Sequence, residues 1–499
     1  MIFDNLPALL VVLPLLGAPL CLLLSRGRPA WLAATLVSWL VLAISIALLW
    51  QVRAGGELHY AFGDWAPPWG IDYVVDRLAA YVLLIVAAIA AVVLPYSWRS
   101  VRRELPTRLH GIFYTLLLLC LAGLLGIVIT GDAFNLFVLL EISSLSTYAL
   151  ISLGRDRRAL TAAYQYLIMG TIGATFYIIG VGLLYMLTGT LNMADMAARM
   201  AAMEGSNTLH TAFAFIVVGL ALKLAMFPLH LWLPNAYAFA PSVVTAFLAA
   251  TATKVALYAM IRFIYNVFGP AFTFGEMHVQ LLVLPLAAAG VFVGSVVAVF
   301  QHGLKRMLAY SSVAQIGYML LGIGAMSVTG LTAALLHLFN HALMKGALFL
   351  AVGALVYRLG GSRLQDIAGI ARDMPWTMAA FVIGGLSLIG VPGTVGFISK
   401  WYLILAALEN GWWPVVVLVL VTSLVAVVYI WRVVETAYFG VRPADAAPVR
   451  EAPLALLVPT WLLVAANLYF GIATGLTVGL AGDIAAGLGA GLGAGGGAP

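Results

Sequence analysis

Ionisable side chains occur inside long apolar stretches of this chain, where a charge is costly. Glu141 lies near the middle of the stretch GDAFNLFVLLEISSLSTYALISLG, residues 131–154. Four of the five lysines also lie within apolar stretches: Lys223, Lys254, Lys345 and Lys400. A lysine at the centre of a bilayer costs about 2.5–3.5 kcal/mol even on lenient scales, so such residues are functional candidates by default. A desolvated lysine can release its proton whereas an arginine cannot, so we predict that these lysines carry protons.

Static ion pairs between helices are an alternative role for these lysines. The acids within or near the apolar stretches are few: Asp132, Glu141 and Glu435. Only Glu141 is far from the end of its stretch, and one carboxylate cannot neutralise four lysines. Some lysines must therefore be neutral part of the time or reach water. Ser144 and Thr147 follow Glu141 closely and can hold water beside it. We add these two residues and His230 as expected supports of an ion path.

Two histidines and a lysine share one face of a predicted helix. The segment HLFNHALMK, residues 337–345, places His337, His341 and Lys345 at intervals of four residues, which is about one helical turn. Imidazole accepts and donates protons near neutral pH, so these groups can pass a proton along the helix with water between them. A zinc site, a haem site and a pair of structural histidines stay open. The segment lacks the adjacent Glu and the nearby Cys that known zinc motifs contain. We therefore expect no metal and no cofactor.

The composition predicts an integral membrane protein. The chain has 499 residues, of which 64% are hydrophobic and 9% are charged. Such a chain is typical of a helical bundle that satisfies its backbone groups internally. Cys21 and Cys120 both lie in apolar runs and indicate no disulfide framework or iron–sulfur site. The net charge of +6 is explained by loop placement, so we expect no nucleic-acid partner. The first apolar run lacks a positive leader and a cleavage site, so we expect a retained span.

Apolar runs of roughly 20 residues predict about fourteen membrane spans. Our approximate boundaries are 5–25, 31–50, 73–94, 111–130, 132–153, 162–188, 210–233, 241–268, 278–300, 304–324, 328–357, 376–407, 412–438 and 453–478. Cations in the loops alternate in phase with these spans, because 17 of them follow odd-numbered spans and 4 follow even-numbered spans. The positive-inside rule then predicts that the odd-numbered loops are cytoplasmic and that both termini lie outside.

Two spans contain residues that interrupt a helix. Span seven holds Pro228 and Pro234, and span twelve holds a set of helix breakers: Gly390, Pro392, Gly393 and Gly396. Each set lies close to a buried lysine, Lys223 in the first case and Lys400 in the second. Such breaks free backbone groups that need water or polar neighbours, and broken helices near a charge mark ion sites in secondary transporters. Kinks that serve packing alone are the alternative.

The two breaks are five spans apart, which predicts a repeated unit of five helices. A repeat with an odd number of spans must be inverted in the membrane. We therefore expect an all-α polytopic membrane protein in which spans 4–8 and 9–13 are inverted repeats with broken helices 7 and 12. The expected regions are a three-helix start at 1–110, repeats at 111–268 and 278–438, and a last helix with a flexible Gly/Ala-rich tail at 439–499.

Several long motifs resemble one superfamily of membrane proteins. They occur in this order: GDAFNLFVLLE (131–141), LTGTLNMADMA (187–197), KLAMFPLHLWLPNAYAFAPSVVTAFLAATATK (223–254), LKRMLAYSSVAQIGY (304–318), HLFNHALMKGALFL (337–350) and GVPGTVGFISKW (390–401). They are similar to the proton-conducting, antiporter-like subunits shared by respiratory complex I, membrane-bound hydrogenases and Mrp-type cation/proton antiporters. Within that superfamily, GDAFNLFVLLE and TGTLNMADMA look most like the D-type subunit of the Mrp-type Na+/H+ antiporter.

The resemblance implies a role for each candidate residue. Glu141 and Lys223 match a switching ion pair, and Lys254 matches a bridging lysine. The other matches are the polar groups of the eleventh span and the terminal residue of the twelfth: His337, His341, Lys345 and Lys400. The implied function is proton translocation, without enzyme activity of its own, in a multisubunit Na+/H+ antiporter of a bacterial or archaeal inner membrane. The implied partners are other membrane subunits, the lipid bilayer, H+ and possibly Na+. The alternative is a proton-pumping subunit of a redox complex.

Overall fold

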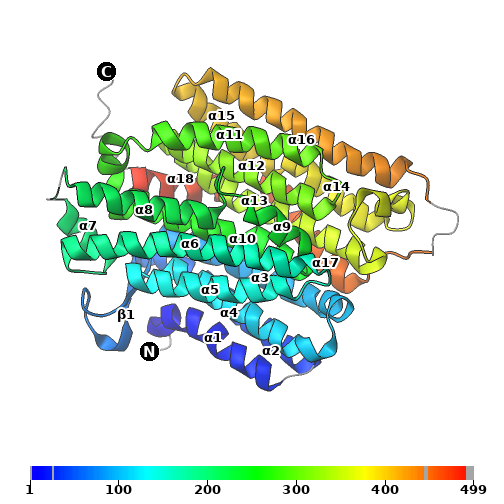
Figure 1. Cartoon of the computed structure of the whole chain (residues 1–499), viewed down its shortest axis with the longest axis horizontal. Helices are drawn as coiled ribbons and strands as arrows, with labels where there is room; N and C mark the ends of the chain where they lie inside the picture. Colours follow the sequence, from blue (N-terminus) through cyan, green and yellow to red (C-terminus); the bar gives the residue numbers. More distant parts are fainter. Residues whose placement is uncertain (1–2, 25–26, 202, 204, 443–447, 490–499) are drawn as a thin grey trace.

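The helices of this protein lie side by side along the long axis of the molecule (Figure 1). The computed structural model describes all residues except 1–2, 25–26, 202, 204, 443–447 and 490–499. Within the described part of the chain, 13 helices are long and apolar enough to cross a membrane. The chain is thus an all-α polytopic membrane protein, as predicted.

The first half of the bundle runs from α1 to α10. Its helices are α1 (Leu6–Leu23), α2 (Arg28–Gly55), α3 (Arg77–Glu104), α4 (His110–Ile129), α5 (Ala133–Ser152), α6 (Arg158–Thr188), α7 (Met193–Met200), α8 (Asn207–Leu224), α9 (Trp232–Phe239) and α10 (Ser242–Ile261). Side-chain caps fix several starts, because Asp132 accepts from the Asn135 amide before α5 and Ser206 accepts from the Leu209 amide before α8. The short α7 is not one of the predicted spans.

The second half runs from α11 to α18. Its helices are α11 (Gln280–Val299), α12 (Leu304–Gly324), α13 (Val328–Leu359), α14 (Pro375–Ile389), α15 (Val395–Glu409), α16 (Trp413–Phe439), α17 (Leu454–Ile472) and α18 (Gly475–Gly489). The predicted span 453–478 is therefore two helices, since the chain is interrupted after Ile472 and resumes at Gly475. α18 continues the chain beyond that span to Gly489, and the rest of the region expected to hold a flexible tail, residues 490–499, lies outside the described residues.

Both predicted helix breaks are present. α8 ends at Leu224, and Ala225 then adopts a left-handed conformation with φ of 61° before α9 begins. α14 ends at Ile389, and α15 begins after a short turn. Gly396 permits the close return of α15, because a Cβ there would lie 1.7 Å from the Ser387 carbonyl oxygen. The four regions and the inverted repeats remain predictions.

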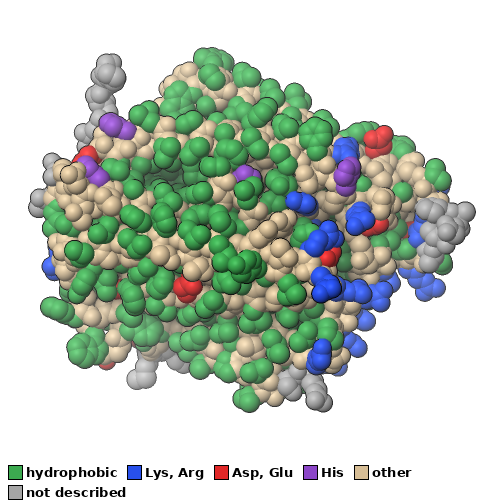
Figure 2. Space-filling view, viewed as in Figure 1, with side chains coloured by type: hydrophobic (Ala, Val, Ile, Leu, Met, Phe, Trp, Pro, Cys, Tyr) green, Lys and Arg blue, Asp and Glu red, His purple; other side chains and the backbone are tan. Residues whose placement is uncertain are grey.

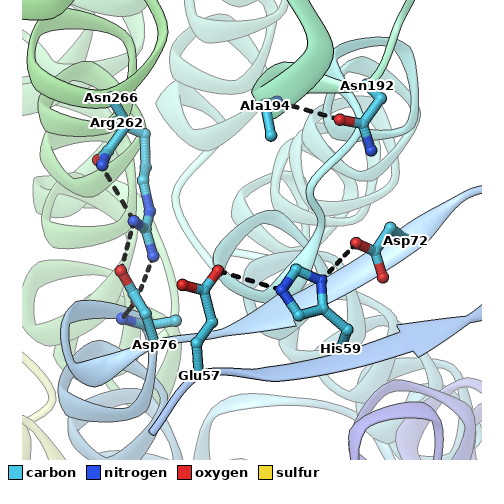
Figure 3. Close-up of polar contacts among 9 residues, drawn as sticks. Glu57, His59, Asp72, Asp76, Asn192, Ala194, Arg262 and Asn266 are labelled. Atoms are coloured by element: carbon cyan, nitrogen blue, oxygen red, sulfur yellow. Dashed lines mark hydrogen bonds and ion pairs between the residues drawn. The ribbon is translucent and has the colours of Figure 1, made fainter. Parts of the chain in front are cut away.

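A small β-hairpin occupies the loop after α2, which the sequence did not predict. β1 (Leu58–Ala61) pairs antiparallel with β2 (Asp72–Val75). Figure 3 draws the polar contacts beside it, where His59 Nδ1 lies 2.7 Å from the Asp72 carboxylate. Asp76, just before α3, binds the guanidinium of Arg262 at the end of α10. Burial raises the pKa of Asp76, but the charge and hydrogen bonds of Arg262 more than offset this and hold it below its usual range. This ionised pair ties the start of α3 to α10.

Charged side chains are unevenly distributed between the two ends of the bundle. Figure 2 shows lysines and arginines gathered at one end, which we call the arginine-rich face. The hairpin and α7 lie at the opposite end, the hairpin face, near the start of α1 and the end of α18 (Figure 1). This segregation matches the alternation of cations along the sequence. Which face is cytoplasmic remains a prediction from the positive-inside rule.

Candidate functional site

The first part of the site joins α5 and α8. Lys223 lies in the last turn of α8 and is 6% exposed. Its Nζ donates a hydrogen bond to Ser144 Oγ at 2.7 Å and lies 3.5 Å from Glu141 Oε1. Glu141 Oε1 has no hydrogen-bond partner among the described residues, so the two charges attract each other without a closed hydrogen bond. Since the Glu141 side chain is 24% exposed, the pair is at the edge of the interior.

A small cavity lies beside this pair. Its volume is about 30 Å³, and its polar wall includes Lys223, Ser144 and Thr147. A water molecule needs about 10–15 Å³ on this scale and two to four polar partners, so the cavity can hold water. Its lining also includes Ala252 and Val255 of α10, the helix that carries Lys254. Ser144 and Thr147 therefore line a cavity that can hold water, and their part in an ion path remains a prediction.

Lys254 is the next candidate and is completely buried in α10. Its Nζ donates to the carbonyl of Ala249 and lies 3.4 Å from Thr253 Oγ1. In the described part of the chain, no direct hydrogen bond or ion pair joins Lys254 to another candidate residue. A direct relay from Lys223 to Lys254 is therefore absent, and any transfer between them requires water or movement.

The three groups predicted to share one helix face, His337, His341 and Lys345, all lie on α13, and we call them the α13 stripe. His337 Nδ1 lies 2.8 Å from Ser399 Oγ, and its Nε2 lies 2.9 Å from Gln315 Oε1. The rings of His337 and His341 are stacked with centroids 6.1 Å apart. His341 is buried, and neither ring nitrogen has a partner among the described residues. Buried polar nitrogens normally have partners, so the two nitrogens of His341 are sites where a water molecule can bind.

Lys345 continues the same stripe by one more turn. Its Nζ donates to the Leu308 carbonyl at 2.8 Å and to Ser311 Oγ at 2.5 Å, both on α12. The side chain is completely buried and has neutral oxygens as partners. His341 and Lys345 lie on α13, which packs against α10, the helix that carries Lys254.

Lys400 ends the predicted line at the break between α14 and α15. Its Nζ donates to the carbonyls of Leu388 and Ile389 at 3.1 and 2.8 Å and to Ser423 Oγ at 2.9 Å. The two carbonyls belong to the last turn of α14, where the helix dipole favours a cation. The ring of Tyr318 lies 5.2 Å from Nζ and adds a cation–π contact.

His230 is buried beside the first break. Its ring stacks on Phe227 at 5.3 Å, and Nδ1 has no partner among the described residues. No described hydrogen bond joins His230 to the line of lysines. The described residues contain no group of three or more His, Cys, Asp or Glu side chains that could hold a metal ion.

Sequence reasoning missed the neutral partners of the basic groups. These are Ser311, Gln315, Tyr318, Ser399 and Ser423. All but Ser423 lie within the motifs quoted for the family resemblance, and each is a polar residue within a predicted span. That signal could have identified them. The backbone carbonyls around Lys400 carry no such signal.

Known proteins match this chain along most of its length. The family model described as NADH:quinone oxidoreductase/Mrp antiporter, TM, matches residues 130–426. The N-type subunit of the NADH-quinone oxidoreductase of Desulforudis audaxviator is 45% identical over 94% of this chain and 96% of its own length. The D-type subunit of the Na(+)/H(+) antiporter of Alkalihalophilus pseudofirmus is 32% identical over 87% of this chain and 86% of its own. A chain of the Mrp complex from Dietzia sp. DQ12-45-1b has a TM-score of 0.88 at 28% identity, and the match covers 98% of both chains.

Proposed function

Since the chain belongs to the NADH:quinone oxidoreductase/Mrp antiporter transmembrane family, and is a membrane subunit of the ion-translocating type, we propose that it carries protons as a subunit of a multisubunit Na+/H+ antiporter. The proposed path begins at Glu141 and Lys223, passes Lys254 and the α13 stripe, and ends at Lys400. The observation that carries this proposal is the burial of every basic group on that path, while Glu141 is the one carboxylate that pairs with any of them among the described residues.

The proposed mechanism starts at the loose ion pair. While Glu141 is ionised beside Lys223, the pair favours a charged lysine. When the pair opens, the desolvated ammonium gives its proton to water in the adjacent cavity and then to Lys254. The proton then passes to the α13 stripe and on to Lys400. These groups interact, so they titrate together and not as independent residues.

Sodium is expected to cross elsewhere in the complex. Na+ is a hard cation that prefers several oxygen ligands, whereas the proposed path is built mostly of nitrogen. Backbone oxygens beside Lys345 and Lys400 already accept hydrogen bonds from these lysines. We therefore propose that this subunit moves H+ and that a partner subunit moves Na+.

A proton-pumping subunit of a redox complex is the second candidate function. The 45% identity to a protein described as a subunit of NADH-quinone oxidoreductase favours it. The same buried path serves either function, because each needs protons to cross the membrane under the control of another subunit. In both cases we expect electron transfer, where it occurs, to be performed by partner subunits.

Cation-resolved flux through the reconstituted native complex tests the proposal. We expect a sodium gradient alone to drive proton movement, and we expect Lys223→Ala and Lys400→Ala, made singly, each to abolish it. Glu435→Gln, a change of an exposed acid of α16 outside the path, is the matched control and should retain transport. Proton flux that needs a redox substrate would favour the second candidate. Undiminished flux in the Lys223 variant would refute both.

A further inference from the structure

A basic pocket opens on the arginine-rich face, where the ends of α3, α9 and α13 meet the loops before α6 and α12. Its volume is about 360 Å³. Three carboxylates and five cationic side chains line it, the cations being Arg155, Arg158, Lys305, Arg306 and Arg363. This pocket takes no part in the proton path proposed above. Its excess of positive charge favours an anionic ligand.

The carboxylates of this pocket are already engaged. Asp156 accepts hydrogen bonds from Arg158 at 2.5–3.1 Å, which lowers the pKa of Asp156 to about 2 and keeps the pair ionised. Glu104 accepts from Ser100 Oγ at 2.7 Å and from the Ser242 amide at 3.0 Å. Asp366 accepts from the Arg363 amide at 2.9 Å.

Two guanidinium groups of the pocket remain available. Arg155 and Arg306 are exposed. Among the described contacts, no hydrogen bond or ion pair engages either guanidinium. An anion in the pocket would therefore meet two unpaired, bidentate donors.

An apolar groove begins at one of these arginines and runs along the side of the bundle. Its volume is about 440 Å³, and it lies between α6, α9 and α12. Apolar and aromatic side chains make most of its wall: Tyr164, Ile168, Met169, Leu231, Trp232 and Tyr310. Arg306 lines both this groove and the basic pocket. The two cavities therefore form a single surface, cationic at the end of the bundle and apolar along its side.

We propose that the basic pocket and the groove together bind one anionic phospholipid. Its phosphate pairs with Arg155 and Arg306, and an acyl chain lies in the groove against Ile168 and Leu231. Basic pockets between membrane helices recognise anionic headgroups, and a groove on the side of a membrane bundle faces acyl chains. Charge complementarity selects this occupant over an apolar helix, which has no anionic group to pair with the two arginines.

The lipid would lie next to the first helix break. Trp232 of the groove stacks on Tyr166 with ring centroids 3.8 Å apart, and Tyr166 lines the cavity beside Lys223. If the proposed function holds, occupancy of the groove would restrain the break and influence proton transfer there. Lipid binding itself does not depend on the proposed function.

Lipid titration of the full chain in detergent, read by native mass spectrometry, tests the proposal. The probes are phosphatidylglycerol, phosphatidylcholine and inorganic phosphate. We expect phosphatidylglycerol to bind more tightly than phosphatidylcholine, and Arg155→Gln and Arg306→Gln each to weaken it about fivefold. Arg108→Gln, an exposed arginine of the same face outside both cavities, is the matched control and should bind as the unmodified chain does. Equal binding of both lipids overturns the proposal. Undiminished binding of phosphatidylglycerol by a variant that carries both Arg155→Gln and Arg306→Gln also overturns it.

Photo-crosslinking in the native complex separates the possible occupants. Phosphatidylglycerol with a photoactivatable group on its acyl chain should label residues 164–169 or 231–235. Inorganic phosphate that displaces this lipid at equal concentration would show a free anion site and overturn the acyl-chain assignment. Labelling of the isolated chain but not of the complex would show that a neighbouring subunit fills the groove, which also overturns the proposal.

Discussion

The two lysines beside the helix breaks differ in what holds their charge. Lys223, before the break between α8 and α9, has the Glu141 carboxylate 3.5 Å away. Lys400, after the break between α14 and α15, instead donates to two carbonyls at the end of α14 and to Ser423. A carboxylate can move or take up a proton, whereas the carbonyls of a helix end stay neutral and fixed. The first break therefore carries a charge that can be switched, and the second supplies a constant environment for a proton.

The largest effect is expected when the switched site loses its carboxylate. Glu141→Gln leaves the Lys223 ammonium without an anion. Removing one partner of a fully buried pair costs about 3–5 kcal/mol, and less here because Glu141 is partly exposed. We expect proton flux through the reconstituted complex to fall to background, since Lys223 then stays neutral. Flux within twofold of the unmodified complex would contradict a switching role for Glu141.

A carboxylate added to the second break should make it resemble the first. Ser423 Oγ lies 2.9 Å from Lys400 Nζ, so Ser423→Asp places a negative charge beside that ammonium. We expect the new pair to trap the proton and slow transport about tenfold, which corresponds to roughly 1.4 kcal/mol. Proton flux measured beside Ser423→Asn, which has the same shape without the charge, checks this expectation. Equal rates in the two variants would show that the charge at Lys400 does not limit transport.

The second break should also be sensitive to an added methyl group, more than an open position on α6 is. Gly396→Ala forces a Cβ against the Ser387 carbonyl, and overpacking of this kind costs about 1–3 kcal/mol. We expect a lower melting temperature together with slower transport. Gly182→Ala on α6 is the control, because a Cβ there meets nothing within 4 Å. If both variants melt alike, the close return of α15 is not structurally important.

The smallest effects should come from removing the hydroxyl partners of the two lysines. Which of the two changes slows transport more tests the comparison between the two breaks. Ser144→Ala removes a hydrogen bond to Lys223, and Ser423→Ala removes one of three from Lys400. A hydrogen bond to a charged group contributes about 1.5–3 kcal/mol. We expect the Ser144 change to slow proton flux more, because two carbonyls still hold Lys400. The reverse order would show that Lys400 depends on its hydroxyl more than on the helix end.

The sequence predicted the bundle well because hydropathy and helix breakers are local signals. Runs of apolar residues gave the spans, and Pro228 and Gly390 mark the two breaks. The hairpin over residues 58–75 was missed because its four-residue strands are short and depend on pairing with each other. The continuation of the last span as α18 was missed because glycine-rich sequence has low helix propensity, which tertiary packing overrides here.

The candidate site was predictable in its charges and not in its partners. Buried lysines are conspicuous in an apolar sequence, and His337, His341 and Lys345 share a face because a helix has a fixed period. The carbonyls that hold Lys400 and the cavity beside Lys223 arise from the approach of separate helices. No local pattern encodes such an approach.

The most direct test of the account is the position of ordered water in a high-resolution cryo-EM map of the native complex. Our central claim is that water connects buried basic groups that do not touch, above all Lys223 with Lys254 and Lys254 with His341. We predict density for water in the cavity beside Lys223 and at the unpartnered nitrogens of His341. A map that is equally well resolved there, and shows these positions dry and closed by apolar side chains, would contradict the claim.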